Sequence, residues 1–104
     1  MPAPRLAHMV YFTCKDRSPE KVEELVTACQ KYLNVQPGIL FFAAGTCDRE
    51  LAREVNDRDW DVALHLIFVD RAAHDLYQSD PTHQKFIYEQ KGNWSQVRVF
   101  DSLV

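Results

Sequence analysis

The chain has 104 residues, of which 46% are hydrophobic and 26% charged, and its formal net charge is −3. This length and balance predict one folded domain over residues 1–104 and exclude a disordered chain. There is no run of basic residues, so neither nucleic acid nor an anionic membrane is an expected partner, and no apolar run approaches the ~20 residues of a membrane span.

Three cysteines, Cys14, Cys29 and Cys47, are odd in number and widely spaced, which argues against a disulfide framework and a structural zinc site. Reduced thiols, together with an N-terminal stretch that lacks the apolar core of a signal peptide, favour a cytoplasmic location. No tight ligand spacing indicates a metal site, and we expect no metal and no cofactor.

The first half of the chain predicts a strand, a helix and a strand. Residues 6–13 form the first strand, and Ser18 and Pro19 then open a helix as N-cap and first-turn proline. The second strand, residues 39–44, stops at Gly45, where we expect a positive φ or a backbone approach too close for a Cβ atom. The helix between them carries one apolar stripe: Val22, Leu25, Val26, Cys29 and Leu33.

The second half predicts a loop, a strand, a helix that breaks, and a last strand. Residues 47–59 are almost all polar and predict an exposed loop. Residues 60–69 read as the third strand and residues 94–100 as the fourth. Asp70 can cap the helix between them, whose apolar face we assign to three residues: Ala73, Leu76 and Tyr77.

That helix should end and restart at Asp80-Pro81, because the residue before a proline disfavours helical backbone angles. Asp80 can then cap a short helix over residues 81–88, with Pro81 at its first position. His83 falls in the first turn. Burial and the helix N-terminus both work against the imidazolium ion, so we expect His83 to be neutral at pH 7 and turned toward the sheet.

The order β-α-β-β-α-β predicts an α+β, ferredoxin-like fold, with a four-stranded antiparallel sheet and both helices on one face. In residues 39–44, odd-numbered positions should face one side and even-numbered positions the other, and both sets are apolar. Helices can cover only one side. We therefore expect a second copy of the chain to cover the other side in a homodimer, the alternative being the polar loop or the C-terminal tail.

Four segments carry a family pattern: HMVYF, QPGILFFAAG, YQSDPTHQKF and VRVFD. In this order they resemble the opening strand, the proline-glycine turn with its strand, the x-P-x-H-x-x-F motif and the closing strand of the stress-responsive A/B barrel family, also called Dabb. The resemblance spans Leu6 to about Asp101 and implies a homodimeric α/β barrel. Val62 departs from it, because many relatives have a histidine there.

The resemblance implies no single activity. In cyclase-like relatives, the histidine matching His83 acts as base beside the tyrosine matching Tyr77, and the position matching His8 lines the same pocket. This set suits proton abstraction next to a carbonyl, with Tyr77 as hydrogen-bond donor and His8 as polariser. The chain would then bind a small, largely apolar ligand between sheet and helices as a cofactor-free lyase or cyclase. The alternative is a non-catalytic, structural or stress-associated dimer.

Each candidate also has a purely structural interpretation. His83 could serve the helix start, Tyr77 could be a core residue, and His8 could be a hydrogen-bonded core histidine. A relative that uses heme or oxygen is disfavoured, because its ligand pattern is absent. Four further side chains are expected to serve packing or solvation: His65, in the dimer barrel; His74, on the polar face of its helix; and Trp60 and Trp94, beside turns.

Overall fold

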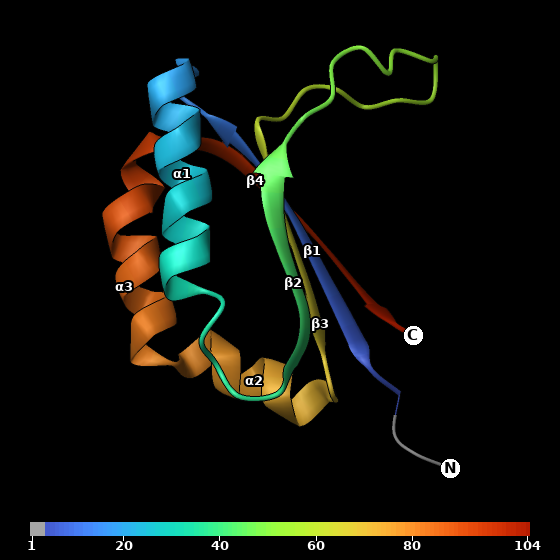
Figure 1. Cartoon of the computed structure of the whole chain (residues 1–104), viewed down its shortest axis with the longest axis vertical. Coiled ribbons are helices and arrows are strands. Elements are labelled where there is room, and N and C mark those ends of the chain that lie inside the picture. Colours follow the sequence, from blue (N-terminus) through green and yellow to red (C-terminus); the bar gives the residue numbers. More distant parts are fainter. Residues whose placement is uncertain (1–3) are drawn as a thin grey trace.

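The computed structural model describes residues 4–104 and places the helices on one face of a four-stranded sheet (Figure 1). Its elements are β1 (Leu6–Cys14), α1 (Pro19–Tyr32), β2 (Ile39–Thr46), β3 (Val62–Phe68), α2 (Arg71–Ser79), α3 (Pro81–Gln90), a 3₁₀ turn η1 (Lys91–Asn93) and β4 (Trp94–Leu103). The strands lie in the order β2-β3-β1-β4, each antiparallel to its neighbours. This is the predicted ferredoxin-like fold. No helix in the described part of the chain is both long and apolar enough to cross a membrane.

The helix boundaries follow the capping residues that the sequence offers. Ser18 accepts a hydrogen bond from the Lys21 amide at the start of α1. Asp80 is extended, with ψ at 133°, and its carboxylate accepts a 2.8 Å hydrogen bond from the Thr82 amide. The predicted break before Pro81 is therefore confirmed, because Asp80 ends α2 and caps α3 at the same time.

Alternate residues of β1 and β3 point toward the helices and form the inner face of the sheet. The α1 stripe packs onto this face: Leu25, Val26, Cys29 and Leu33 are buried and Val22 is partly buried, as predicted. Burial of this apolar surface is the main source of the fold's stability. The strand residues of the core are Leu6, Val10, Phe12, Cys14, Val62, Leu64, Leu66 and Phe68.

A bulge in β2 changes which residues share a face. Ile39 pairs with Phe68 and Phe41 pairs with Ile67, so Leu40 is left between them without a partner. The extra residue places Ile39 on the inner face. The predicted odd–even alternation of residues 39–44 is therefore wrong at Ile39 and correct from Phe41 onward.

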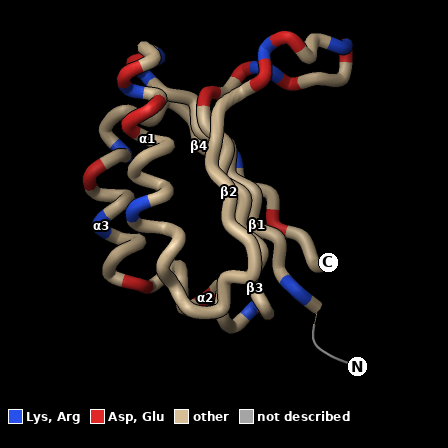
Figure 2. The backbone as a smooth tube through the Cα atoms, in the orientation of Figure 1, with Lys and Arg blue, Asp and Glu red and all other residues tan. Residues whose placement is uncertain are grey.

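No helix covers the opposite, outer face of the sheet (Figure 1). Charges gather on the helices and on the loop after β2, whereas the strands carry few (Figure 2). Phe41 and Phe100 are 50% and 56% exposed. Most of the loop extends away from the sheet, and only its last part touches the outer face, where Trp60 packs 5.0 Å from Tyr11 and Asp57 pairs with Arg98. The C-terminal residues continue β4, so most of this face is left uncovered. By their pairing, the residues of the outer face include Met9, Tyr11, Phe41, Ala43, His65, Ile67, Arg98 and Phe100.

The glycine with a special conformation is Gly38, and the prediction for Gly45 is wrong. Gly45 has no positive φ, and nothing lies within 4 Å of a Cβ placed on it. Gly38 has a φ of +85°, and a Cβ there would come within 2.6 Å of the Ala73 Cβ. The turn before β2 therefore needs glycine both for its backbone angle and for its contact with α2.

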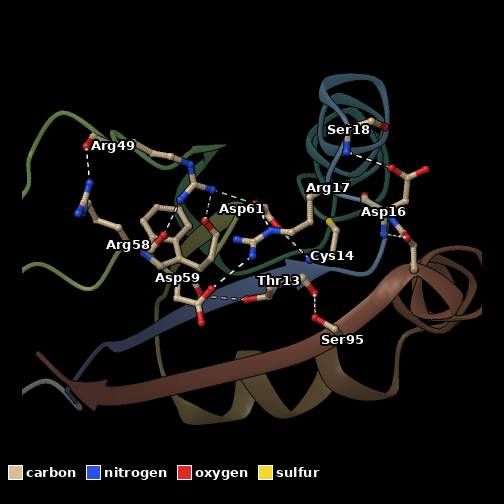
Figure 3. Close-up of polar contacts among 12 residues, drawn as sticks. Thr13, Cys14, Asp16, Arg17, Ser18, Arg49, Arg58, Asp59, Asp61 and Ser95 are labelled. Atoms are coloured by element: carbon tan, nitrogen blue, oxygen red, sulfur yellow. Dashed lines mark hydrogen bonds and ion pairs between the residues drawn. The ribbon is translucent and has the colours of Figure 1, made fainter.

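Asp61 anchors the long loop that joins β2 to β3 (Figure 3). Its buried carboxylate accepts hydrogen bonds from the Cys14 amide at 2.8 Å, from Arg17 Nε at 3.1 Å and from Arg49 Nη2 at 2.9 Å. The Thr13 hydroxyl adds a 3.0 Å bond to the Asp59 carbonyl. The loop is exposed, as predicted, but its last residues are fixed to the end of β1.

Candidate functional site

A cavity of about 170 Å³ lies between the inner face of the sheet and helices α2 and α3. It contains all three predicted site residues, His8 from β1, Tyr77 from α2 and His83 from α3. Most of the remaining wall is aliphatic or aromatic, with Val10 and Phe86 among its members. The α2–α3 break brings Tyr77 and His83 to the same wall, so their joint placement follows from the Asp-Pro junction.

His83 lies in the first turn of α3 and is buried, with its ring 4.5 Å from that of Tyr77, centroid to centroid. Its Nδ1 is buried and has no hydrogen-bond partner among the described residues. Burial lowers the pKa of His83 below 6.5 and the neighbouring His8 lowers it further, whereas a hydrogen bond with the Gln78 backbone opposes the shift. The lowered pKa agrees with the expectation that the His83 ring is neutral at pH 7. In a neutral ring that carries its proton on Nε2, Nδ1 keeps a lone pair that can accept a hydrogen bond.

Tyr77 is both a core residue and part of the cavity wall. Its ring packs 5.1 Å from Phe68 and 5.9 Å from His8, measured between centroids. Burial raises the pKa of the phenol above its ordinary value, so the hydroxyl keeps its proton. A protonated phenol at a cavity wall can donate a hydrogen bond to an occupant.

His8 is held by a carboxylate that the sequence does not point to. Its Nδ1 lies 2.5 Å from Asp101 Oδ1, because the pairing of β1 with β4 places the two residues opposite each other. Burial lowers the pKa of His8, and the hydrogen bond with Asp101 opposes this shift. A proton on Nδ1, shared with Asp101, leaves Nε2 as a hydrogen-bond acceptor.

His74 is not on a solvated face, contrary to the prediction. Its side chain is 14% exposed, and its ring centroid lies 5.1 Å from that of His8. Leu76, assigned to the apolar face, is instead 70% exposed. Ala73 and Tyr77 form the centre of the buried face, and positions 74 and 76 flank it on opposite sides, so helical spacing alone cannot decide which of them turns inward.

Trp94 packs against the core, as predicted, and also lines the cavity. Its ring lies 4.9 Å from Phe12 and 5.7 Å from Phe86, which confirms packing. Its Nε1 is buried and has no partner among the described residues, and the side chain lines the cavity. Like His83 Nδ1, it is a buried polar atom without a partner in a residue of the cavity wall, a donor where the neutral histidine nitrogen is an acceptor.

Two other residues, His65 and Val62, lie outside this cavity. His65 is on the outer face, as expected, with its ring 6.1 Å from that of Tyr11. Val62, where many relatives have a histidine, is fully buried on the inner face and supplies no polar group.

A larger groove of about 730 Å³ lies beside the loop after β2, lined by charged residues around Asp61 (Figure 3). Most of its charges are already paired within the chain, and Arg58 donates to the Arg49 carbonyl. Arg17 and Arg49 bind Asp61, and Arg17 also reaches Asp59 at 3.4 Å. Cations paired in this way have little left to offer a ligand, so the groove serves to hold the loop, and the smaller cavity is the better candidate site.

Comparison with known proteins places the chain in a family. Residues 6–104 match the stress responsive A/B barrel domain, Dabb. No curated protein matches the sequence. Solved structures of the same fold include a dimeric ferredoxin-like protein of unknown function from Thermobifida fusca YX, with 21% identity over 98% of this chain and 92% of that one and a TM-score of 0.81.

Two further solved structures are similar. A Dabb family protein from Mesorhizobium loti has 20% identity over 97% of each chain and a TM-score of 0.79. Hydroxynitrile lyase from Passiflora edulis has 19% identity over 100% of this chain and 95% of that chain, with a TM-score of 0.78. Identities at this level show the fold alone. Because the domain match spans nearly the whole sequence and the fold agrees, the chain belongs to the stress-responsive A/B barrel domain family.

Proposed function

We propose that this chain binds a small, largely apolar organic molecule in the cavity and acts on it as a cofactor-free lyase or cyclase, with His83 transferring the proton. The observation that carries the proposal is a pair of buried, unpartnered nitrogens, His83 Nδ1 and Trp94 Nε1, in two residues that line one mostly apolar cavity. A buried polar group without a partner costs roughly 1–3 kcal/mol. An occupant that satisfies both nitrogens therefore regains a substantial binding energy.

The cavity size limits the occupant. An engineered cavity of about 150 Å³ in another protein holds one benzene molecule. The present cavity, at about 170 Å³, therefore suits a molecule of about one ring with a short polar substituent. A carbonyl oxygen on that substituent would accept from Trp94 or Tyr77, and an acidic C–H or O–H group would face His83.

The residues divide the chemistry between them. The neutral His83 Nδ1 accepts a proton from carbon next to the carbonyl, and the negative charge that develops on oxygen is met by the protonated Tyr77 hydroxyl. His8, oriented by Asp101, positions the substrate from the opposite wall. The presence of a hydroxynitrile lyase among the similar structures supports lyase chemistry on this fold.

The proposal includes a homodimer formed through the outer face. Its apolar character supports this assembly, as does the description of a similar structure as dimeric. A second candidate function is a non-catalytic, structural or stress-associated dimer. The packing of the His83 ring 4.5 Å from that of Tyr77 favours it, because this contact ties α3 to α2 whether or not a ligand binds.

The test uses the two tryptophans of the chain as a probe and its matched control. In a ¹H–¹⁵N spectrum, acetophenone, a single-ring ketone, should shift the indole N–H signal of Trp94 and leave that of Trp60, which packs against Tyr11 on the outer face. His83→Ala should weaken the binding. Equal shifts of both indole signals, or of neither at millimolar ketone, would exclude binding in the cavity.

A further inference from the structure

We propose that His8, His74 and Asp101 form a binding site for a divalent transition-metal ion of the zinc type, next to the cavity. One ligand atom from each residue lies within 4.8 Å of the others. The three come from β1, α2 and β4, and the fold brings them together without any local sequence motif. This inference stands apart from the proposed reaction, because it concerns metal binding alone.

The site needs only small side-chain movements to close around an ion. Zinc bonds of about 2.0–2.2 Å place neighbouring ligands of a tetrahedral site roughly 3.4 Å apart. The present His8–Asp101 distance of 2.5 Å must lengthen, and any separation close to the 4.8 Å bound must shorten. Asp101 can move, because its side chain is 43% exposed on the edge strand β4, whereas His8 is fixed in the core.

A neighbouring carboxylate orients the His74 ring for metal binding. Its Nδ1 lies 3.1 Å from the Asp75 carboxylate, an arrangement that orients many metal-binding histidines and leaves Nε2 for the ion. The Gln78 amide, now 3.4 Å from Nε2, would have to turn away. Two imidazoles and one carboxylate suit Zn²⁺ and Co²⁺, whereas Mg²⁺ and Ca²⁺ prefer sites built of oxygen ligands.

Metal binding would change how His8 faces the cavity. The ion takes the place of the proton between His8 Nδ1 and Asp101, and that proton moves to Nε2 of the same ring. His8 would then present an N–H donor to the cavity in place of an acceptor. Three protein ligands leave at least one coordination position open to solvent or to another ligand.

The experiment is calorimetric titration of the metal-free chain with ZnCl₂, repeated with MgCl₂. We expect one Zn²⁺ per chain and no Mg²⁺ binding. His74→Ala and Asp101→Asn should each lower the Zn²⁺ affinity about a hundredfold or more, because even partners behind a ligand are worth 10- to 100-fold. Two controls should leave it unchanged: His65→Ala, on the outer face, and Cys47→Ser, which removes the partly exposed thiol.

Three results would overturn the site: no binding by the wild-type chain at millimolar Zn²⁺, affinity retained in both ligand variants, or equal loss in His65→Ala. If His74→Ala does not fold, His74→Gln replaces it. An independent readout is the ¹⁵N spectrum of the His8 ring, in which Zn²⁺ should move the proton from Nδ1 to Nε2. A His8 tautomer unchanged at saturating Zn²⁺ would also refute the assignment.

Discussion

Replacing Phe100 by alanine should weaken a homodimer formed through the outer face of the sheet. Phe100 is 56% exposed in the single chain and packs beside Tyr11 on that face. A phenylalanine buries about 200 Å² when fully covered, so about 110 Å² of Phe100 remains for a partner to cover. At about 25 cal/mol per Å², covering it contributes about 2.5–3 kcal/mol from each copy.

A two-fold interface contains the substitution twice, so the total loss is about 5 kcal/mol, equivalent to a several-thousandfold rise in the dimer Kd. This is an upper limit, since area converts incompletely into affinity. Sedimentation equilibrium over a concentration series measures it directly. The wild-type chain should have a mass of about 24 kDa at micromolar concentration, twice the 12.1 kDa of one chain.

The matched control is Leu76→Ala, which removes an exposed leucine from the helix side of the molecule and should leave the Kd unchanged. A wild-type chain that sediments at the single-chain mass would refute the reasoning. So would a Leu76→Ala variant that weakens assembly as much as Phe100→Ala.

Three further predictions concern stability, each measured by urea unfolding. Asp61→Asn should lower the free energy of unfolding by about 2 kcal/mol, because it weakens the bonds from the Cys14 amide and from two partly exposed arginines. The control Asp59→Asn, at an exposed position, should change it by about 0.5 kcal/mol or less. Equal losses in the two variants would contradict the anchoring role of Asp61. Gly38→Ala should lower the free energy of unfolding by at least about 2 kcal/mol, because position 38 has a positive φ and a Cβ there would meet Ala73. Gly92→Ala is the control, because a Cβ there would lie in open space, and its loss should be less than half as large. Finally, the pKa values of His8 and His83 in the folded chain lie below 6.5, so the unfolded chain takes up protons first as the pH falls. With EDTA present, the free energy of unfolding should be full above about pH 7 and should fall as the pH drops below 6.5, less steeply in His83→Asn. A profile that stays flat with pH would contradict the lowered pKa values.

The element order and the helix ends could be predicted because local chemistry decides them. Asp80 before Pro81 must leave the helical region and is then placed to cap α3, whatever the rest of the fold does. The shared cavity of His83 and Tyr77 follows from the same junction. The apolar outer face could be predicted too, because consecutive apolar residues in a strand point to both faces of its sheet.

What the sequence could not show depends on tertiary geometry. The bulge at Leu40 depends on how β2 pairs with β3, and no residue type marks it. The inward turn of His74 depends on how α2 rotates against the sheet. Asp101 reaches His8 through strand pairing across 93 residues of sequence, a relation that spacing does not encode.

The central claim is that His83 moves a proton at a bound carbonyl compound, and hydrogen–deuterium exchange tests it without knowledge of the natural substrate. Acetophenone in D₂O, with EDTA present, is followed by ¹H NMR for loss of its α-proton signal. The wild-type chain should accelerate this exchange, and His83→Ala and Tyr77→Phe should each lose the acceleration while remaining folded. The outer-face variant His65→Ala should retain it. Acceleration that survives unchanged in His83→Ala, with the ketone still bound, would contradict the account.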